Sequence, residues 1–186
     1  MGKIIGAFNM TLDGVCDHTK GIADEEIHDH YAAMLDRADG MLFGRITFEL
    51  MEFWKTVLDS PTGNKAMDDF AVSIDRIPKI VFSRTLTSVD WDSARLATRE
   101  LREEALALKE QPGTILVGSR SLIIALMKMG LLDELQLTVH PVVAGEGMPF
   151  FEDFHDYRIL KLTKTKTFGC GAVTLFYEPG TAQAAK

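Results

Sequence analysis

The sequence predicts an α/β protein with a mixed, mostly parallel sheet, flanking helices and a C-terminal antiparallel β-hairpin. Short apolar segments alternate with helix-like segments through roughly the first 140 residues, a pattern typical of parallel sheets. The last third changes to period-two alternation on both sides of a glycine-rich turn, which indicates a hairpin. Together these patterns predict a parallel sheet with an antiparallel end.

The N-terminal third is predicted to form two strands and two helices. Residues 3–10 and 41–43 are short apolar runs, typical of buried strands. Asp24 is a suitable N-cap for a helix that extends to about residue 37, because a short polar side chain can accept a hydrogen bond from the first helical turn. A second helix is expected over residues 45–57.

The middle of the chain is predicted to form two helices separated by strands. Asn64 is suited to cap a helix that carries four apolar residues on one side, namely Met67, Phe70, Ala71 and Ile74. Residues 79–82 and 89–91 are expected to be strands. Residues 94–110 are rich in Leu, Ala, Glu, Arg and Lys, a composition that favours helix.

The C-terminal part is predicted to contain two more parallel strands, one helix and the hairpin. Residues 114–117 and 135–139 are the strands. Residues 121–129 form an apolar helix between them, which Gly130 is expected to end. Residues 157–168 and 172–177 are the two hairpin strands, joined by glycines 169 and 171.

Composition limits the classes of protein to which this chain can belong. A length of 186 residues with 46% hydrophobic content predicts a single domain over residues 1–178, with a frayed tail over 179–186. A net charge of −7 argues against a nucleic-acid partner. No apolar run is long enough to span a membrane, and two isolated cysteines favour a reducing, cytoplasmic location.

Three predicted strands end with a small residue followed by arginine, at Arg45, Arg84 and Arg120. Carboxyl ends of parallel strands meet at one edge of a sheet, where helix N-termini also favour anions. The arginine fork matches phosphate oxygens, so these segments predict a site for a phosphate-rich ligand. Taken singly, each segment is equally explained as a tight turn or a helix cap. The candidate binding residues are Gly44, Arg45, Thr47, Ser83, Arg84, Gly118, Ser119, Arg120 and Ser121.

Asp13 is the carboxylate of most interest, because it follows the first strand at the same predicted sheet edge. The alternative is that Asp13 and Gly14 simply form a turn. The histidines do not predict a metal site, since His28 and His30 are two residues apart and point in different directions on a helix. His18, His140 and His155 have no Cys or carboxylate partners at ligand spacing. No Ser-His-Asp or Cys-His set is recognisable, so nucleophilic catalysis has little support.

Four ordered segments resemble the dihydrofolate-reductase-like superfamily, and more closely the C-terminal reductase domain of the bifunctional riboflavin-biosynthesis deaminase-reductase. They are Thr-Leu-Asp-Gly at 11–14, Gly-Arg-Ile-Thr-Phe-Glu at 44–49, Lys-Ile-Val-Phe-Ser-Arg-Thr-Leu at 79–86, and the stretch from 130 to 147. The sequence lacks the motifs of the deaminase half. It also lacks the Pro-Trp that a true dihydrofolate reductase carries after its first strand, so folate is a poor candidate substrate.

The resemblance implies an NADPH-dependent oxidoreductase. Arg45 and Thr47 would hold cofactor phosphate, Ser83 and Arg84 the 2′-phosphate, and residues 118–121 the pyrophosphate, while Asp13 would lie near the nicotinamide and act in catalysis. The family often has paired glycines where Gly118 and Ser119 stand. The implied substrate is a small molecule such as a ribosylaminopyrimidine, and the family implies a homodimer. The alternatives are a reductase of an unrelated carbonyl, imine or pterin substrate, and a non-catalytic dinucleotide-binding module.

Overall fold

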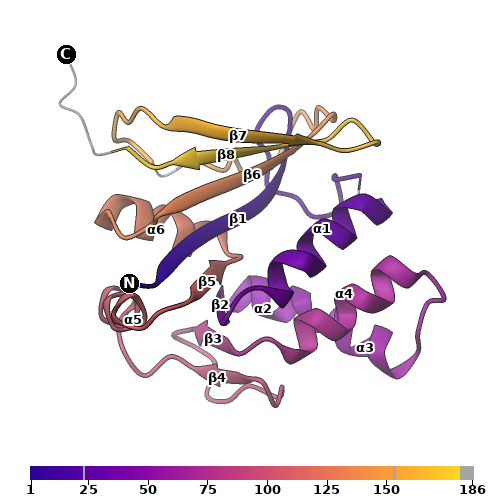
Figure 1. Cartoon of the computed structure of the whole chain (residues 1–186), viewed down its shortest axis with the longest axis horizontal. Helices are drawn as coiled ribbons and strands as arrows, with labels where there is room; N and C mark the ends of the chain where they lie inside the picture. Colours follow the sequence, from indigo (N-terminus) through magenta and orange to yellow (C-terminus); the bar gives the residue numbers. More distant parts are fainter. Residues whose placement is uncertain (23, 153, 181–186) are drawn as a thin grey trace.

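The computed structural model describes residues 1–22, 24–152 and 154–180. Its eight strands form one sheet in the order β4-β3-β2-β5-β1-β6-β8-β7 (Figure 1). The strands are β1 (Lys3–Thr11), β2 (Gly40–Gly44), β3 (Lys79–Phe82), β4 (Ala94–Leu96), β5 (Thr114–Val117), β6 (Glu134–His140), β7 (Lys161–Thr167) and β8 (Val173–Glu178). The helices are α1 (Glu25–Asp36), α2 (Arg45–Met51), α3 (Phe53–Asp59), α4 (Lys65–Arg76), α5 (Leu101–Glu110) and α6 (Arg120–Met129).

The sheet is mostly parallel, as predicted. Strands β1 to β6 all pair in parallel, β8 pairs antiparallel with β6, and β7 pairs antiparallel with β8. The predicted C-terminal hairpin is therefore confirmed, although β7 begins at Lys161 rather than at residue 157. Because six strands run the same way, the carboxyl ends of β1, β2, β3, β5 and β6 meet along one edge. That edge carries every residue predicted to bind phosphate.

Each face of the sheet carries a layer of helices and a separate hydrophobic core (Figure 1). Leu42 and Val117 point to the face where α5 and α6 pack, whereas their neighbours Phe43 and Leu116 point to the face of α1, α2 and α4. This alternation follows from the two-residue repeat of a strand. Strands buried on both faces explain why the sequence showed continuous apolar runs.

Helix boundaries at three places follow the predicted signals. The side chain of Asp24 accepts a hydrogen bond from the backbone N–H of Ile27, and Asn64 does the same for Met67. Gly130 ends α6 in the left-handed conformation, with φ of 68°, which glycine adopts without steric cost.

The predicted helix over residues 94–110 is wrong in its first third. Residues 94–96 form β4, which pairs with β3, and the helix begins only at Leu101. The predicted strand at 89–91 is also absent. Instead Trp91 is buried and its indole N–H donates to the carboxylate of Asp75 at 2.7 Å. Pairing along the free edge of β3 has overridden the local helix propensity.

Buried Lys79 links this edge of the sheet to the neighbouring loops. Its Nζ donates to the backbone carbonyls of Asp75 and Ile77 and to the hydroxyl of Ser93. The same amine lies 4.2 Å from the ring centroid of Trp91. Burial lowers the pKa of Lys79 from 10.5 to about 8, and the nearby Asp75 opposes that shift.

The predicted helix over 45–57 is divided into α2 and α3, which are separated at Glu52. The division accompanies the packing of Trp54 against Phe70 of α4, with ring centroids 4.5 Å apart. Of the predicted C-terminal tail, residues 181–186 lie outside the described residues. In the described ranges, no helix is both long and apolar enough to cross a membrane, and no three His, Cys, Asp or Glu side chains gather as metal ligands would.

Candidate functional site

A mainly apolar cavity of about 300 Å³ lies at the carboxyl ends of β1, β2, β5 and β6, beneath α1 and α3. Its walls include Met34, Phe43 and Trp54, and its polar groups include Asn9 and His140. A largely apolar cavity with a few polar groups is the usual form of a small-molecule site. Two residues predicted to bind cofactor, Thr47 and Gly118, also line it.

Aromatic rings form one wall of this cavity. The imidazole of His28 packs edge-on against the rings of Trp54 and Phe70, with ring centroids 5.8 and 6.1 Å apart. Its Nδ1 lies 3.0 Å from the backbone carbonyl oxygen of Asp24. A carbonyl oxygen can only accept, so Nδ1 carries the hydrogen, and in the neutral ring Nε2 is left as an acceptor.

Hydrogen-bonded side chains form the polar floor. The amide oxygen of Asn9 lies 3.1 Å from both the hydroxyl of Tyr31 and Nε2 of His140. Tyr31 also contacts the hydroxyl of Thr138 at 2.9 Å, which in turn contacts Thr174 at 2.7 Å. Burial raises the pKa of Tyr31 to about 12, so it stays protonated at neutral pH.

The predicted cofactor residues of β2 and β5 are brought together. The hydroxyl oxygen of Ser119 accepts a hydrogen bond from the backbone N–H of Gly44 at 2.8 Å. A side chain at Gly44 would meet Ser119 and Ser121 at 3.6–3.7 Å, and one at Gly118 would meet Met41 at 2.6 Å. The two strand ends are thus in contact, and a side chain at position 118 would displace the terminal methyl of Met41.

Helix α6 begins at this junction without a side-chain cap. Ser119 occupies the N-cap position, but its hydroxyl is engaged by Gly44 and makes no cap hydrogen bond. The first N–H groups of a helix have no intrahelical acceptor, and the positive end of the helix dipole favours negative charge. The start of α6 is therefore suited to hold a phosphate group.

The three strand-end arginines are not equivalent. Arg84 is exposed after β3, where the hydroxyl of Ser83 accepts hydrogen bonds from Thr85 and Leu86 and fixes the turn. Arg45 is paired with both carboxylate oxygens of Glu49, at 3.0 and 2.9 Å. A phosphate at Arg45 would thus compete with an ion pair already present.

Arg120 is directed into the protein. Its Nε donates to the backbone carbonyls of Pro149 and Phe150, at 3.0 and 2.9 Å, and its side chain is only 13% exposed. Its guanidinium also lies 3.6 Å from the carboxylate of Glu152. These contacts fasten the segment after β6 to the start of α6.

Asp13 fastens a second loop. Its carboxylate accepts hydrogen bonds from the Thr11 hydroxyl at 2.5 Å and from the backbone N–H groups of Ala144 and Gly145, at 3.1 and 2.8 Å. These bonds, that from Thr11 foremost, lower the pKa of Asp13 from 3.8 to about 2. Asp13 does not line the cavity, and a carboxylate held in this way is a poor proton donor.

Sequence reasoning did not select Asn9 or His140 for this site. Asn9 is a polar residue between Phe8 and Met10 in an apolar strand, and that contrast was the available signal. His140 was considered only as a metal ligand, because its partners Ile22 and Asn9 come from segments distant in sequence.

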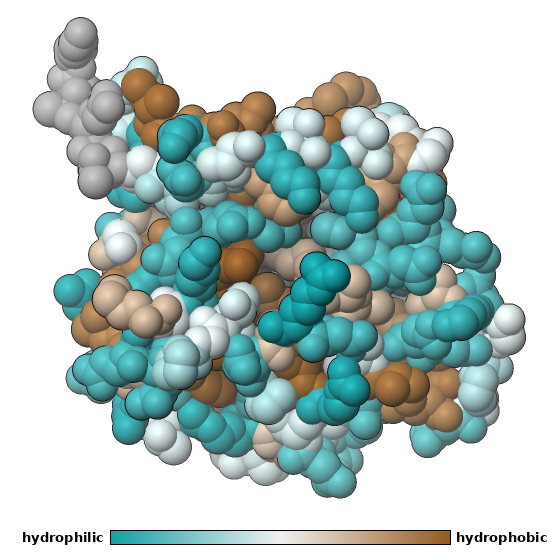
Figure 2. Space-filling view, in the orientation of Figure 1, coloured by the Kyte–Doolittle hydropathy of each residue, from teal (hydrophilic) through white to brown (hydrophobic). Residues whose placement is uncertain are grey.

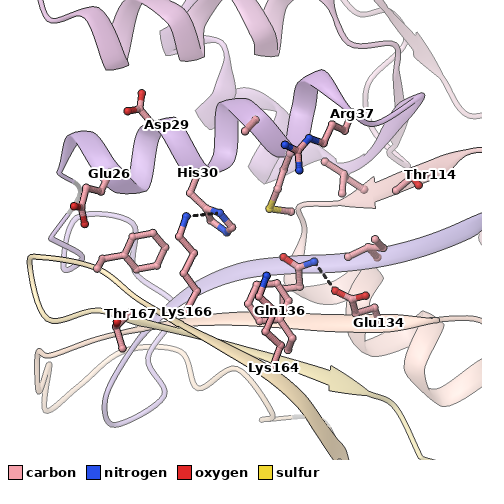
Figure 3. A pocket seen from close by; sticks show the side chains of 16 residues that line it. Glu26, Asp29, His30, Arg37, Thr114, Glu134, Gln136, Lys164, Lys166 and Thr167 are labelled. Atoms are coloured by element: carbon pink, nitrogen blue, oxygen red, sulfur yellow. Dashed lines mark hydrogen bonds between the residues drawn. The ribbon is translucent and has the colours of Figure 1, made fainter.

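A second and larger cleft, of about 830 Å³, lies between α1 and the strands β6, β8 and β7. Figure 2 shows that this face is hollowed, with hydrophilic side chains around an apolar floor. Arg37, Lys164 and Lys166 contribute positive charge, while Asp29 and Glu134 contribute negative charge (Figure 3). This cleft contains none of the residues predicted to bind cofactor.

Comparison with known proteins identifies the family. Residues 2–174 match the model of the RibD C-terminal domain. The chain belongs to the RibD C-terminal domain family. The uncharacterized protein YyaP of Bacillus subtilis (strain 168) is 34% identical over 180 residues, which cover 94% of each chain.

Solved structures confirm the predicted fold. A protein of Shewanella sp. PV-4 named for riboflavin biosynthesis superposes with a TM-score of 0.72 at 18% identity, covering 96% of this chain and 99% of that one. The diaminohydroxyphosphoribosylaminopyrimidine deaminase/5-amino-6-(5-phosphoribosylamino)uracil reductase of Thermotoga maritima gives 0.64 at 14% identity. That match covers 96% of this chain and 56% of the Thermotoga chain.

Proposed function

We propose that this protein is an NADPH-dependent reductase that transfers hydride to a small molecule such as a ribosylaminopyrimidine. The observation that carries the proposal is the apolar cavity at the carboxyl ends of β1, β2, β5 and β6, which adjoins the uncapped start of α6. A ring can enter such a cavity while its phosphates remain at the helix terminus. Membership of the RibD C-terminal domain family, and the fold shared with the deaminase/reductase of Thermotoga maritima, support the same reaction.

The residues present fit a dinucleotide phosphate. The first turn of α6, including Ser121, would hold the pyrophosphate, with Gly118 and Gly44 permitting close approach of the backbone. Arg84, which is exposed at the end of β3, would bind the 2′-phosphate beside Ser83. Thr47 would reach the cofactor from the cavity wall. Arg45 would bind phosphate only if its ion pair with Glu49 were broken.

The chemistry divides between cofactor and protein. When bound, NADPH supplies hydride from C4 of its nicotinamide to an electrophilic carbon. The apolar walls around Met34, Phe43 and Trp54 exclude water from that carbon. We assign to Asp13 a positioning role, because its hydrogen bonds to residues 144 and 145 fix the loop beside the site.

Binding and turnover measurements test this function. Titration calorimetry with NADP⁺ and with 2′,5′-ADP should show micromolar or tighter binding. Loss of NADPH absorbance in the presence of 5-amino-6-(5-phosphoribosylamino)uracil should show turnover. A folded protein that binds neither nucleotide would refute the proposal.

Two alternatives use the same cofactor site. In the first, the protein reduces an unrelated small carbonyl, imine or pterin compound. In the second, the protein binds the dinucleotide without catalysis. NADPH oxidation across a panel of carbonyl and imine substrates separates them, because a non-catalytic module would bind NADPH and oxidise none.

We further propose that the protein acts as a cytoplasmic homodimer. Asp29, Ala33 and Arg37 are exposed on α1 at intervals of four residues and border the large cleft. If two copies pair their α1 helices antiparallel about Ala33, each Asp29 faces the other copy's Arg37. Light scattering should give a dimer mass, Arg37→Asp should dissociate the dimer, and the exchanged pair Asp29→Arg with Arg37→Asp should restore it.

The proposed cytoplasmic location is supported by the two cysteines. Cys16 and Cys170 are free thiols, which suit a reducing compartment.

A further inference from the structure

A chain of hydrogen bonds at the floor of the apolar cavity has a fixed direction. The backbone N–H of Ile22 donates to Nδ1 of His140 at 3.1 Å. A backbone amide can only donate here, so Nδ1 is the acceptor and the hydrogen of the neutral imidazole is on Nε2. Burial of His140 lowers its pKa, which keeps the ring neutral at physiological pH.

This direction determines the orientation of the Asn9 amide. Nε2 of His140 is a donor and lies 3.1 Å from the side-chain amide of Asn9, so the amide atom that accepts this hydrogen bond must be the oxygen. The hydroxyl of Tyr31 donates to the same oxygen at 3.1 Å. Tyr31 can then accept from Thr138, since that contact allows either atom as donor. Each bond in the chain is satisfied by this one arrangement.

The amide nitrogen of Asn9 is consequently left with both hydrogens unused. Among the described residues this nitrogen makes no hydrogen bond, and both contacts of the amide involve its oxygen. The side chain is exposed and lines the cavity. A flip of the amide would bring two donors against Tyr31 and His140, so the NH₂ group is held toward the cavity.

We propose that Asn9 is a specificity-determining residue that donates a hydrogen bond from its NH₂ group to a carbonyl oxygen of the molecule in the cavity. The chemical class is an amide or lactam carbonyl on a planar ring, because the surrounding walls are apolar and aromatic. Such a carbonyl occurs in the carboxamide of nicotinamide and in the ring of a pyrimidinedione. The inference rests on the proposed function, to which it adds a recognition group.

The substitution Asn9→Asp provides a near-isosteric test. An aspartate retains an oxygen that accepts from Tyr31 and His140, but it replaces the NH₂ donor with a second acceptor. Binding is measured by calorimetry with three probes: NADP⁺, 2′,5′-ADP, which lacks nicotinamide, and 5,6-diaminouracil, a pyrimidinedione. We expect affinity for 2′,5′-ADP to be unchanged and affinity for NADP⁺ or 5,6-diaminouracil to fall at least about tenfold.

The pattern of loss identifies the partner. A loss confined to NADP⁺ assigns the nicotinamide carboxamide, and a loss confined to 5,6-diaminouracil assigns the substrate ring. Unchanged affinity for both overturns the inference while leaving the proposed function intact. Wild-type protein that binds none of the three probes overturns both.

A second variant separates recognition from a structural role. Asn9→Ala removes the donor without adding charge, and it also leaves Tyr31 and His140 without their shared acceptor. It should lower both the melting temperature and the affinity for the same probe that Asn9→Asp affects. If Asn9 were only structural, Asn9→Ala would lower the melting temperature and neither variant would change affinity.

Discussion

The hydroxyl of Ser119 accepts the backbone N–H of Gly44 at 2.8 Å, so a side chain that could have capped α6 instead joins the ends of β2 and β5. One contact thus has two effects. It satisfies a backbone donor at the end of a central strand, and it leaves the helix terminus open to an anion. The Ser119 hydroxyl therefore connects two strands instead of capping the helix.

Replacing Ser119 with alanine should therefore destabilise the fold. Ser119 is 2% exposed, and its loss leaves the Gly44 N–H unpaired, which costs about 1–3 kcal/mol. Urea unfolding monitored by circular dichroism measures the change. Ser121→Ala is the matched control, since Ser121 is exposed and should change stability by less than about 0.5 kcal/mol. Equal effects of the two variants would contradict the contact.

Arg84 and Arg120 should respond differently to alanine. Arg84 is exposed, so Arg84→Ala should keep the melting temperature and weaken NADP⁺ by roughly 1.5–3 kcal/mol, the value of a charge-assisted hydrogen bond. Arg120→Ala should lower the melting temperature, because two carbonyl contacts to Pro149 and Phe150 are lost. Calorimetry and thermal unfolding on both variants measure this. Loss of NADP⁺ affinity in neither variant would refute the placement of the 2′-phosphate at Arg84.

Lys79 should make stability depend on alkaline pH. Its pKa is about 8 in the folded chain against 10.5 ordinarily, so between these values the unfolded chain binds more protons. Stability from this group therefore rises with pH between 8 and 10. Lys79→Met removes that rise, and leaves its carbonyl partners unpaired at a cost of about 1–3 kcal/mol at pH 7. Urea midpoints at pH 7, 8, 9 and 10 measure the slope, and parallel curves for both proteins would contradict the prediction.

Asp13 should make stability depend on acid pH, and here too stability rises with pH. Its pKa is lowered to about 2, so its stabilising effect is present above pH 3.8 and disappears as pH falls toward 2. The difference in melting temperature between wild type and Asp13→Asn should be largest at pH 5 and should shrink by pH 3. Asp92→Asn, at an exposed residue, serves as the control. A difference that stays constant with pH would show that the Asp13 carboxylate is not the stabilising group.

The sheet could be predicted from the sequence because buried parallel strands are short and apolar. The helices between them also begin and end at recognisable capping residues. Asp24, Asn64 and Gly130 marked helix ends through local hydrogen bonding and backbone conformation, which the neighbouring residues alone determine. Residues 94–96 could not be predicted in this way. Their strand depends on pairing with the edge of β3, a contact that helix-favouring composition does not reveal.

The candidate site residues likewise divide into those that the local sequence predicts and those that depend on contacts between distant segments. The small residues and arginines at strand ends were recognisable, since the meeting of strand ends follows from parallel topology. The direction of each arginine was not, because Arg120 turns toward carbonyls at 149 and 150 and Arg45 toward Glu49. The polar floor of the cavity is formed by Asn9, Tyr31 and His140, which come from three separate segments, so no local sequence pattern predicts it.

The position of β1 within the sheet also determines when the chain can fold during its synthesis. β1 leaves the ribosome before β5 and β6, yet Lys3 pairs with Thr114 of β5 and Thr11 pairs with His140 of β6. Both edges of this apolar strand therefore remain unpaired until the segments that form β5 and β6 have been made. Such an interval exposes a strand prone to pairing with other chains. We expect the nascent chain to need protection by chaperones until β6 has emerged.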